Sequence, residues 1–155
     1  MSEFINNQLY LDIPASFHVM SAEEIGQYQA AGETPHWAIQ DPDQHIILTI
    51  SARQVNPFLS LTVKAKDAIG SMEKQISRMM EPYSYHRDCF DQLPVGEKTA
   101  YAVNYSYIAQ GIKMRAVSGI LKNGRTFYYI HAYYREANSE ESLETIRDIL
   151  KNGRW

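Results

Sequence analysis

The segment "IKMRAVSGILKNGRTFYYIHAYYRE", residues 112–136, decides the fold, because two strand-like runs meet there at one tight turn. Asn123-Gly124 between such runs favours a two-residue hairpin turn of type I′, which needs positive φ at both central residues. A turn centred on this dipeptide fixes the partners across the hairpin. On one face of the sheet these partners are Ile120 with Phe127, Ser118 with Tyr129, Ala116 with His131, and Met114 with Tyr133.

The preceding segment, residues 97–108, carries large side chains at every second position and predicts another strand of the same meander. The simplest pairing sets Tyr107 opposite Ile112. One side of the three strands, which we call the tyrosine face, then gathers Tyr101, Tyr105, Tyr107, Met114, Ala116, Ser118, Ile120, Phe127, Tyr129, His131 and Tyr133. The opposite side, the small-residue face, includes Ala100, Ala102, Gly119 and Ala132.

The small-residue face gives helices room to approach, so the helices are expected there. The tyrosine face then forms a trough, because the middle strand carries the small residues Ala116 and Ser118 and the strands on either side carry tyrosines. Soluble monomers rarely expose an apolar patch of this extent, so a terminus, a loop, a second subunit or a ligand is expected to cover it. The alternative is that this face is ordinary core beneath a helix, because aromatic residues commonly fit a pleated, half-buried surface.

The rest of the chain predicts an α+β domain, an antiparallel β-sheet meander flanked by two to three helices, with residues 1–155 forming a single domain. A short strand ends at Pro14, and a helix with a Ser21–Glu24 capping box runs toward Gly32. A proline turn, residues 41–44, joins two strands into a hairpin. Two amphipathic helices follow at residues 66–82 and 138–153.

Composition argues for a folded protein outside the nucleic-acid-binding classes. Hydrophobic residues make up 45% and charged residues 21%, and the net charge is −3. That balance disfavours a dominant nucleic-acid or anionic-membrane surface, although it leaves room for a local basic patch. The one cysteine, Cys89, forms no internal disulfide, and no segment approaches a membrane span or a signal peptide. We therefore expect a cytoplasmic protein with no stable membrane insertion.

The residues that could carry chemistry do not form a recognisable site. The stretch "SYHRDCFD", residues 84–91, collects histidine, cysteine and aspartates, but adjacent residues of a strand point to opposite faces. Zinc would need three or four ligands at a known spacing. His131 lacks an acidic residue on its own face to orient it as a base. The prediction is that the protein has no catalytic residues, no metal and no cofactor.

Three short patterns resemble the PsbP-like superfamily. They are "LYLDIPASF" at residues 9–17, "VGEKTAYAVNYSY" at residues 95–107, and "NGRTFYYIHAYY" at residues 123–134 before the terminal helix. Phe17 stands where a tryptophan is often found. The superfamily includes PsbP proteins, Mog-type nuclear import factors, DcrB-related proteins and Eag-type chaperones. The resemblance implies an antiparallel sheet flanked by helices in a family of binders and adaptors. Within it, the chain looks most like the cytoplasmic, dimeric Eag-type chaperones, which are similar in length and shield apolar segments of effectors with an apolar sheet surface.

The leading hypothesis is a non-enzymatic, chaperone-like adaptor that holds an apolar helix or peptide. Methionine and tyrosine suit this work, because one is adaptable and the other amphipathic. The predicted binding residues are Tyr101, Tyr105, Met114, Tyr129, His131 and Tyr133. A protein or peptide is the expected partner, and a homodimer is expected as well. The alternatives are a small-molecule binding domain or small hydrolase with a pocket around His131, or a plain structural subunit.

Overall fold

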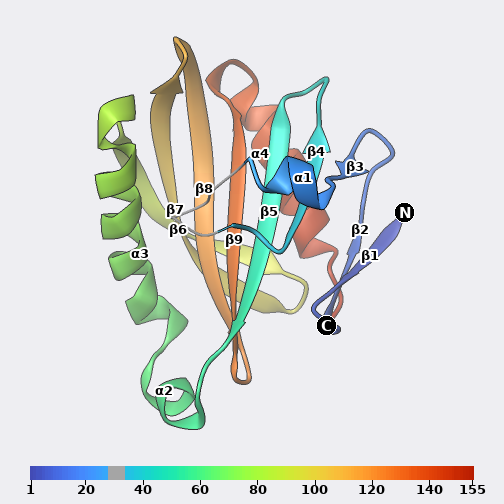
Figure 1. The fold of residues 1–155 in the computed structure, drawn as a ribbon, viewed down its shortest axis with the longest axis vertical. Coiled ribbons are helices and arrows are strands. Elements are labelled where there is room, and N and C mark those ends of the chain that lie inside the picture. The colour runs from blue at the N-terminus through green and yellow to red at the C-terminus, as the bar shows by residue number, and fades with distance from the viewer. Residues whose placement is uncertain (28–33) are drawn as a thin grey trace.

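A computed structural model describes residues 1–27 and 34–155, and its centre is one twisted sheet (Figure 1). All neighbouring strands of this seven-stranded sheet pair antiparallel, and the predicted antiparallel α+β fold is confirmed. In spatial order the strands are β3 (His18–Val19), β4 (Trp37–Asp41), β5 (Ile46–Gln54), β9 (Thr126–Arg135), β8 (Ile112–Asn123), β7 (Lys98–Ala109) and β6 (His86–Val95).

The β8–β9 hairpin is present, but its register differs from the prediction by two residues. Asn123 pairs with Thr126, so Gly124 and Arg125 form the turn, and of these Gly124 has a φ of +63°. The predicted type I′ turn on Asn123-Gly124 was therefore wrong. The partners are Ile120 with Tyr129, Ser118 with His131, and Ala116 with Tyr133. Because side chains alternate with a period of two, a shift of two leaves every residue on its predicted face.

The β7–β8 hairpin differs from the prediction in the same way. Tyr107 lies opposite Met114, and Ala109 lies opposite Ile112. The turn residues Gln110 and Gly111 both have positive φ, at +52° and +77°, as a type I′ turn requires. The tyrosine face again keeps its predicted members.

The two long helices lie on opposite faces of the sheet. Helix α4 (Ser139–Lys151) packs on the small-residue face against β6 and β9, behind the sheet in Figure 1. Helix α3 (Ala65–Met80) packs on the tyrosine face against β7 and β8, at the left of Figure 1. The expectation that the helices occupy the small-residue face was wrong for α3. Its apolar stripe buries Ile69, Met72 and Ile76 against aliphatic and aromatic members of the tyrosine face.

The second core, between α4 and the sheet, is mostly aliphatic, with Phe17, Tyr128 and Tyr134 buried in it. Ile146 and Leu150 of α4 are fully buried among the small-residue strands. The small hairpin formed by β1 (Ser2–Ile5) and β2 (Leu9–Asp12) closes this core, where Leu9 and Leu11 are fully buried. The predicted strand at residues 9–13 is thus confirmed as half of a hairpin.

The short elements were predicted only in part. Ser21 and Glu24 form the predicted capping box, with N–H···O distances of 3.1 and 3.2 Å, but helix α1 (Ala22–Ile25) ends well before Gly32, which lies outside the described residues. The β4–β5 hairpin is confirmed, and its Asp41 carboxylate accepts two turn N–H groups. Several elements were not among those predicted: β1, β3, β6, α2 (Pro57–Thr62) and two 3₁₀ turns, η1 (Glu81–Tyr83) and η2 (Glu136–Asn138).

Candidate functional site

A groove of about 500 Å³ lies on the tyrosine face, where α3 does not cover it. Helix α3 occupies the β7–β8 side of this face, whereas Ile25 of α1 packs with Ala38 and Ile47 on the β4–β5 side. The groove opens between them, over β5, β9 and the ends of β7 and β8. Its described lining, which we call the tyrosine groove, is Gln27, Ile47, Thr49, Ile76, Met79, Met80, Tyr83, Tyr105, Tyr107, Ala109, Gln110, Met114 and Tyr133.

The described lining of the tyrosine groove contains no charged residue. Four tyrosines and three methionines dominate it. Met79 and Tyr83 are exposed at its rim, whereas Ile76 and Tyr105 are buried at its base. Such a lining offers apolar area together with a few hydroxyl and amide groups, which is the usual composition of a ligand site.

The structure gathers three of the six predicted binding residues in the tyrosine groove: Tyr105, Met114 and Tyr133. Tyr101 lines a different hollow beneath α3, and Tyr129 is half-buried against the cluster that α3 covers. His131 is 3% exposed and lies beneath the surface. The tyrosine face is therefore partly ordinary core, as the alternative hypothesis held, and partly a groove.

A chain of polar side chains runs beneath the tyrosine groove. The Nδ1 atom of His131 lies 2.7 Å from the Oγ of Ser118, which lies 3.2 Å from the Tyr105 hydroxyl. The Tyr105 hydroxyl also hydrogen-bonds with Tyr133. Each of these polar groups thus has a partner, as buried polar groups require. The network spans β9, β8 and β7 and holds the floor of the groove in one arrangement.

Burial keeps every member of this network neutral near pH 7. It raises the pKa of the Tyr105 phenol to about 12 and raises the pKa of the Tyr133 phenol well above its ordinary value. It lowers the pKa of the His131 imidazole to about 4. The tyrosine groove therefore presents neutral phenols and thioethers, and none of its described side chains is poised to exchange a proton near neutrality.

The pair of His131 and Ser118 has the short contact of a base and a nucleophile, but not the access. Ser118 is fully buried, and neither residue belongs to the described lining of the groove. A substrate in the groove would meet the tyrosines above this pair. The geometry gives no support to the alternative of a hydrolase pocket around His131.

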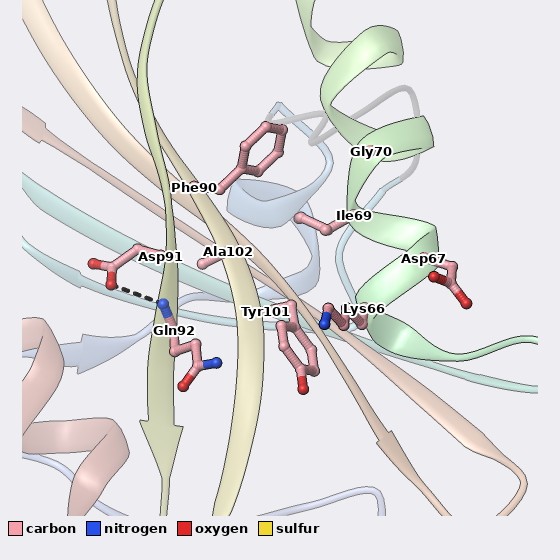
Figure 2. Close-up of a pocket in the computed structure, with 9 residues that line it drawn as sticks. All are labelled: Lys66, Asp67, Ile69, Gly70, Phe90, Asp91, Gln92, Tyr101 and Ala102. Atoms are coloured by element: carbon pink, nitrogen blue, oxygen red, sulfur yellow. Dashed lines mark hydrogen bonds between the residues drawn. The ribbon is translucent and has the colours of Figure 1, made fainter.

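A second hollow, of about 790 Å³, lies between the first half of α3 and strands β6 and β7 (Figure 2). Ile69 and Gly70 of α3 face Phe90 and Tyr101 across it. Lys66 and Asp67 stand at its edge, on the first turns of the helix. Tyr101, a predicted binding residue, thus belongs to a separate hollow, which has charged side chains in its lining, unlike the tyrosine groove.

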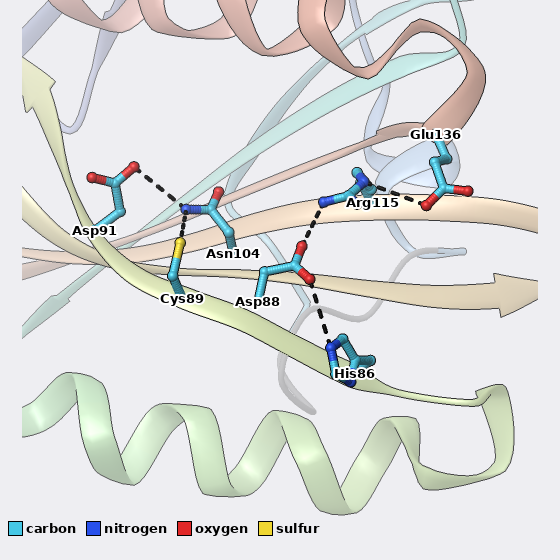
Figure 3. A network of polar contacts seen from close by, with 7 residues as sticks. All are labelled: His86, Asp88, Cys89, Asp91, Asn104, Arg115 and Glu136. Atoms are coloured by element: carbon cyan, nitrogen blue, oxygen red, sulfur yellow. Dashed lines mark hydrogen bonds and ion pairs between the residues drawn. The ribbon is translucent and has the colours of Figure 1, made fainter.

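The histidine, cysteine and aspartates of residues 84–91 lie on the edge strand β6 and are engaged in surface contacts (Figure 3). Asp88 lies 2.5 Å from the Arg115 guanidinium and 4.0 Å from His86. Cys89 is exposed and lies 3.7 Å from the Asn104 amide. Among residues 1–27 and 34–155, no three His, Cys, Asp or Glu side chains are grouped to hold a metal ion. The cluster is best explained as ion pairing at the sheet edge.

Comparisons with known proteins establish the fold. No family model matches the sequence, and no curated protein matches it. The solution structure of cyanobacterial PsbP (CyanoP) from Synechocystis sp. PCC 6803 matches over 94% of this chain and 85% of its own, with a TM-score of 0.65 and 9% identity. LpqN of Mycobacterium tuberculosis, described as involved in cell envelope biogenesis, matches over 94% and 82%, with a TM-score of 0.61 and 9% identity. The predicted PsbP-like fold is confirmed.

A third match, a protein of Pseudomonas aeruginosa described as a putative regulator, covers 98% of this chain and 94% of its own at a TM-score of 0.53 and 8% identity. At such identities the likeness concerns the fold alone. The finer assignment to the DcrB-related, Eag-type or Mog-type proteins stays a prediction. No helix among the described residues is long and apolar enough to cross a membrane.

Sequence reasoning missed the helix side of the tyrosine groove. Ile76, Met79 and Met80 belong to the apolar spacing that predicts the helix at residues 66–82, and this spacing does not say which face of the sheet the helix covers. The contribution of β5, through Ile47 and Thr49, depends on the β5–β9 pairing. That pairing joins strands far apart in the sequence, and no local sequence pattern predicts it.

Proposed function

We propose that this protein is a non-catalytic binding protein that holds an apolar helix or peptide in the tyrosine groove. The observation that carries the proposal is the composition of the groove: four tyrosines, three methionines and no charged residue in its described lining. A volume of about 500 Å³ suits the anchor side chains of one peptide, and methionines adapt to anchors of different shape.

The proposal includes a chaperone-like role, in which the groove shields an apolar segment of a partner. The neutral state of Tyr105, Tyr133 and His131 supports a holding function over a catalytic one, since neutral buried groups supply no acid or base near pH 7. A homodimer and a cytoplasmic location belong to the same proposal. Sedimentation equilibrium of the purified chain tests the dimer.

The test compares two glutamate substitutions on strand β8. Met114→Glu places a charge in the groove, whereas Ile112→Glu places the same charge two residues away at an exposed position outside its described lining. A fluorescent, leucine-rich helical peptide is titrated into each protein and followed by anisotropy. We expect Met114→Glu to weaken binding at least about tenfold, because an unpaired charge disfavours apolar contact, and Ile112→Glu to leave it nearly unchanged.

Equal loss in both variants, or no binding by the wild type, would contradict the proposal. An apolar dye that binds wild type and fails to bind Met114→Glu, while the peptide binds neither, would instead favour the small-molecule alternative. That alternative rests on the same volume, which falls within the range of small-molecule pockets.

A further inference from the structure

Helix α2 displays the two most exposed large apolar side chains among the described residues. Phe58 is 82% exposed and Leu61 is 84% exposed, whereas other such residues past the N-terminal methionine reach at most 49%. They are three residues apart, so they lie on the same side of the short helix. Single exposed hydrophobic residues are ordinary, but an adjacent pair at the tip of a molecule indicates a contact surface.

The backbone of this segment is tied to the sheet. Lys122 of β8 donates from its ammonium to the carbonyl of Ser60, and its Nζ also lies 3.5 Å from the carbonyl of Val63. The Ser60 hydroxyl donates to the Gly124 carbonyl at 3.4 Å, and the N–H of Val55 donates to the Arg125 carbonyl at 2.9 Å. The apolar pair is therefore held at one end of the molecule, beside the β8–β9 turn at the bottom of Figure 1.

The same end of the molecule is basic. The sequence has no acidic residue from 44 to 66 and none from 98 to 135, the two stretches that meet there. Exposed Lys64 and Lys66 follow α2, and exposed Arg125 lies in the adjoining turn. Asp67, on the first turn of α3, is the next acidic residue along the chain. Glu97, in the turn between β6 and β7, borders the second stretch at this end, so the exposed cations form a local group on a chain whose net charge is −3.

We propose that this surface, which we call the α2 pole (Pro57–Thr62 with Lys64, Lys66 and Arg125), docks onto anionic lipid bilayers. An apolar pair flanked by cations matches the interface of such a membrane, where side chains enter the acyl boundary and cations meet lipid phosphates. A convex tip fits a deformable, extended surface better than it fits a concave protein site. Docking of this kind needs no membrane-spanning helix. The α2 pole is separate from the tyrosine groove, so the two proposals can fail independently.

Co-sedimentation with vesicles tests the proposal. The full chain is mixed with vesicles of phosphatidylcholine alone and of phosphatidylcholine with phosphatidylglycerol. We expect binding to the anionic vesicles, weakened by salt. Phe58→Ser with Leu61→Ser is expected to reduce the partition coefficient at least about tenfold, and Lys64→Gln with Arg125→Gln roughly tenfold or more. All four side chains are exposed, so the fold is expected to persist in both variants.

The matched control is Ile108→Ser with Ile112→Ser. These exposed residues flank the β7–β8 turn at the opposite end of the molecule, and their loss is expected to leave vesicle binding unchanged. Absence of binding, equal binding to both vesicle types, or equal loss in the control would overturn the proposal. So would concentration-dependent self-association that disappears with Phe58 and Leu61, because the occupant of the α2 pole would then be a second copy of the chain.

Discussion

The two faces of the sheet are made by alternate residues of the same strands, yet they are packed in different ways. On the small-residue face, α4 closes a core whose buried side chains are mostly aliphatic or alanine, with Ile146 and Leu150 fully buried. On the tyrosine face, α3 and α1 leave a groove between them, and a histidine, a serine and two tyrosine hydroxyls lie beneath it.

Side-chain size accounts for much of this difference. At Gly119 an added Cβ would lie 3.5 Å from the Cβ of Ala100 and 3.6 Å from that of Ala102, so this part of the small-residue face is low, while larger members of the same face such as Tyr128 are buried in the α4 core. The tyrosines of the other face stand higher and carry hydroxyl groups that need partners. On the small-residue face the β1–β2 hairpin and α4 together close the core, whereas on the tyrosine face the part between α3 and α1 stays a groove.

The largest expected effect distinguishes the two helix interfaces directly. Ile146→Ala in α4 leaves a cavity in a closed core and is expected to lower the free energy of unfolding by about 2–5 kcal/mol. Ile76→Ala in α3 removes the same atoms beside the tyrosine groove, where water can reach the vacated space, and is expected to fall at the lower end of that range. Urea denaturation measures both.

An equal loss of unfolding free energy in Ile146→Ala and Ile76→Ala would show that the two helix interfaces exclude water equally well. The two faces of the sheet would then not differ in how they are packed. An Ile76→Ala variant that is as stable as wild type would show that α3 contributes little to folding. Either result would change the description of how tightly α3 packs beside the tyrosine groove.

The next expected effect is a pH dependence of the free energy of unfolding that comes from His131, on the tyrosine face. The His131 pKa is about 4 in the folded protein and 6.5 in the unfolded chain, so the unfolded chain binds the additional proton between these values. The stability that His131 contributes is thus fully present above pH 6.5 and is lost as the pH falls toward 4. The loss amounts to about 3 kcal/mol over that window, at 1.36 kcal/mol per pKa unit.

The measurement is the free energy of unfolding from pH 7 to pH 4 for wild type and for His131→Gln. The other titratable groups are common to both proteins, so the difference in slope between them isolates the histidine. Identical slopes would mean that His131 is solvated and protonated in the folded state. The buried polar network would then be open to water, and the tyrosine groove would extend to it.

The sequence predicted the composition of the two faces better than their packing. Strand alternation assigned Tyr105, Met114 and Tyr133 to one face, and an error of two residues in the turn did not change that assignment, because two residues is the full strand period. The turn was misplaced by one residue because Gly124 suits two kinds of hairpin turn. It can be the second turn residue after Asn123, as predicted, or the first turn residue before Arg125, as in the structure.

Other features had no local signal. Strand β6 lies at the sheet edge, with all of its first half exposed and Pro94 near its end, so its first half lacks the alternation that marks a half-buried strand. Helix α2 is six residues long and begins at a proline. The position of α3 over the tyrosine face depends on contacts across the whole chain. The tyrosine groove is the part of that face that α3 leaves uncovered. For this reason only three of the six predicted binding residues line it.

The smallest expected effect examines the polar network one hydroxyl at a time. Tyr105→Phe removes the hydroxyl that joins Ser118 to Tyr133 while keeping the ring, and it is expected to lower the free energy of unfolding by about 1 kcal/mol. Ser118→Ala leaves His131 Nδ1 without this partner and is expected to lower the free energy of unfolding by about 1–3 kcal/mol.

The double variant should lose less unfolding free energy than the two single losses combined, because both substitutions break the shared Ser118–Tyr105 contact. Strict additivity in urea denaturation would mean that the hydroxyls act separately. The floor of the tyrosine groove would then be set by ring packing alone, as the small-residue face is set by its aliphatic side chains.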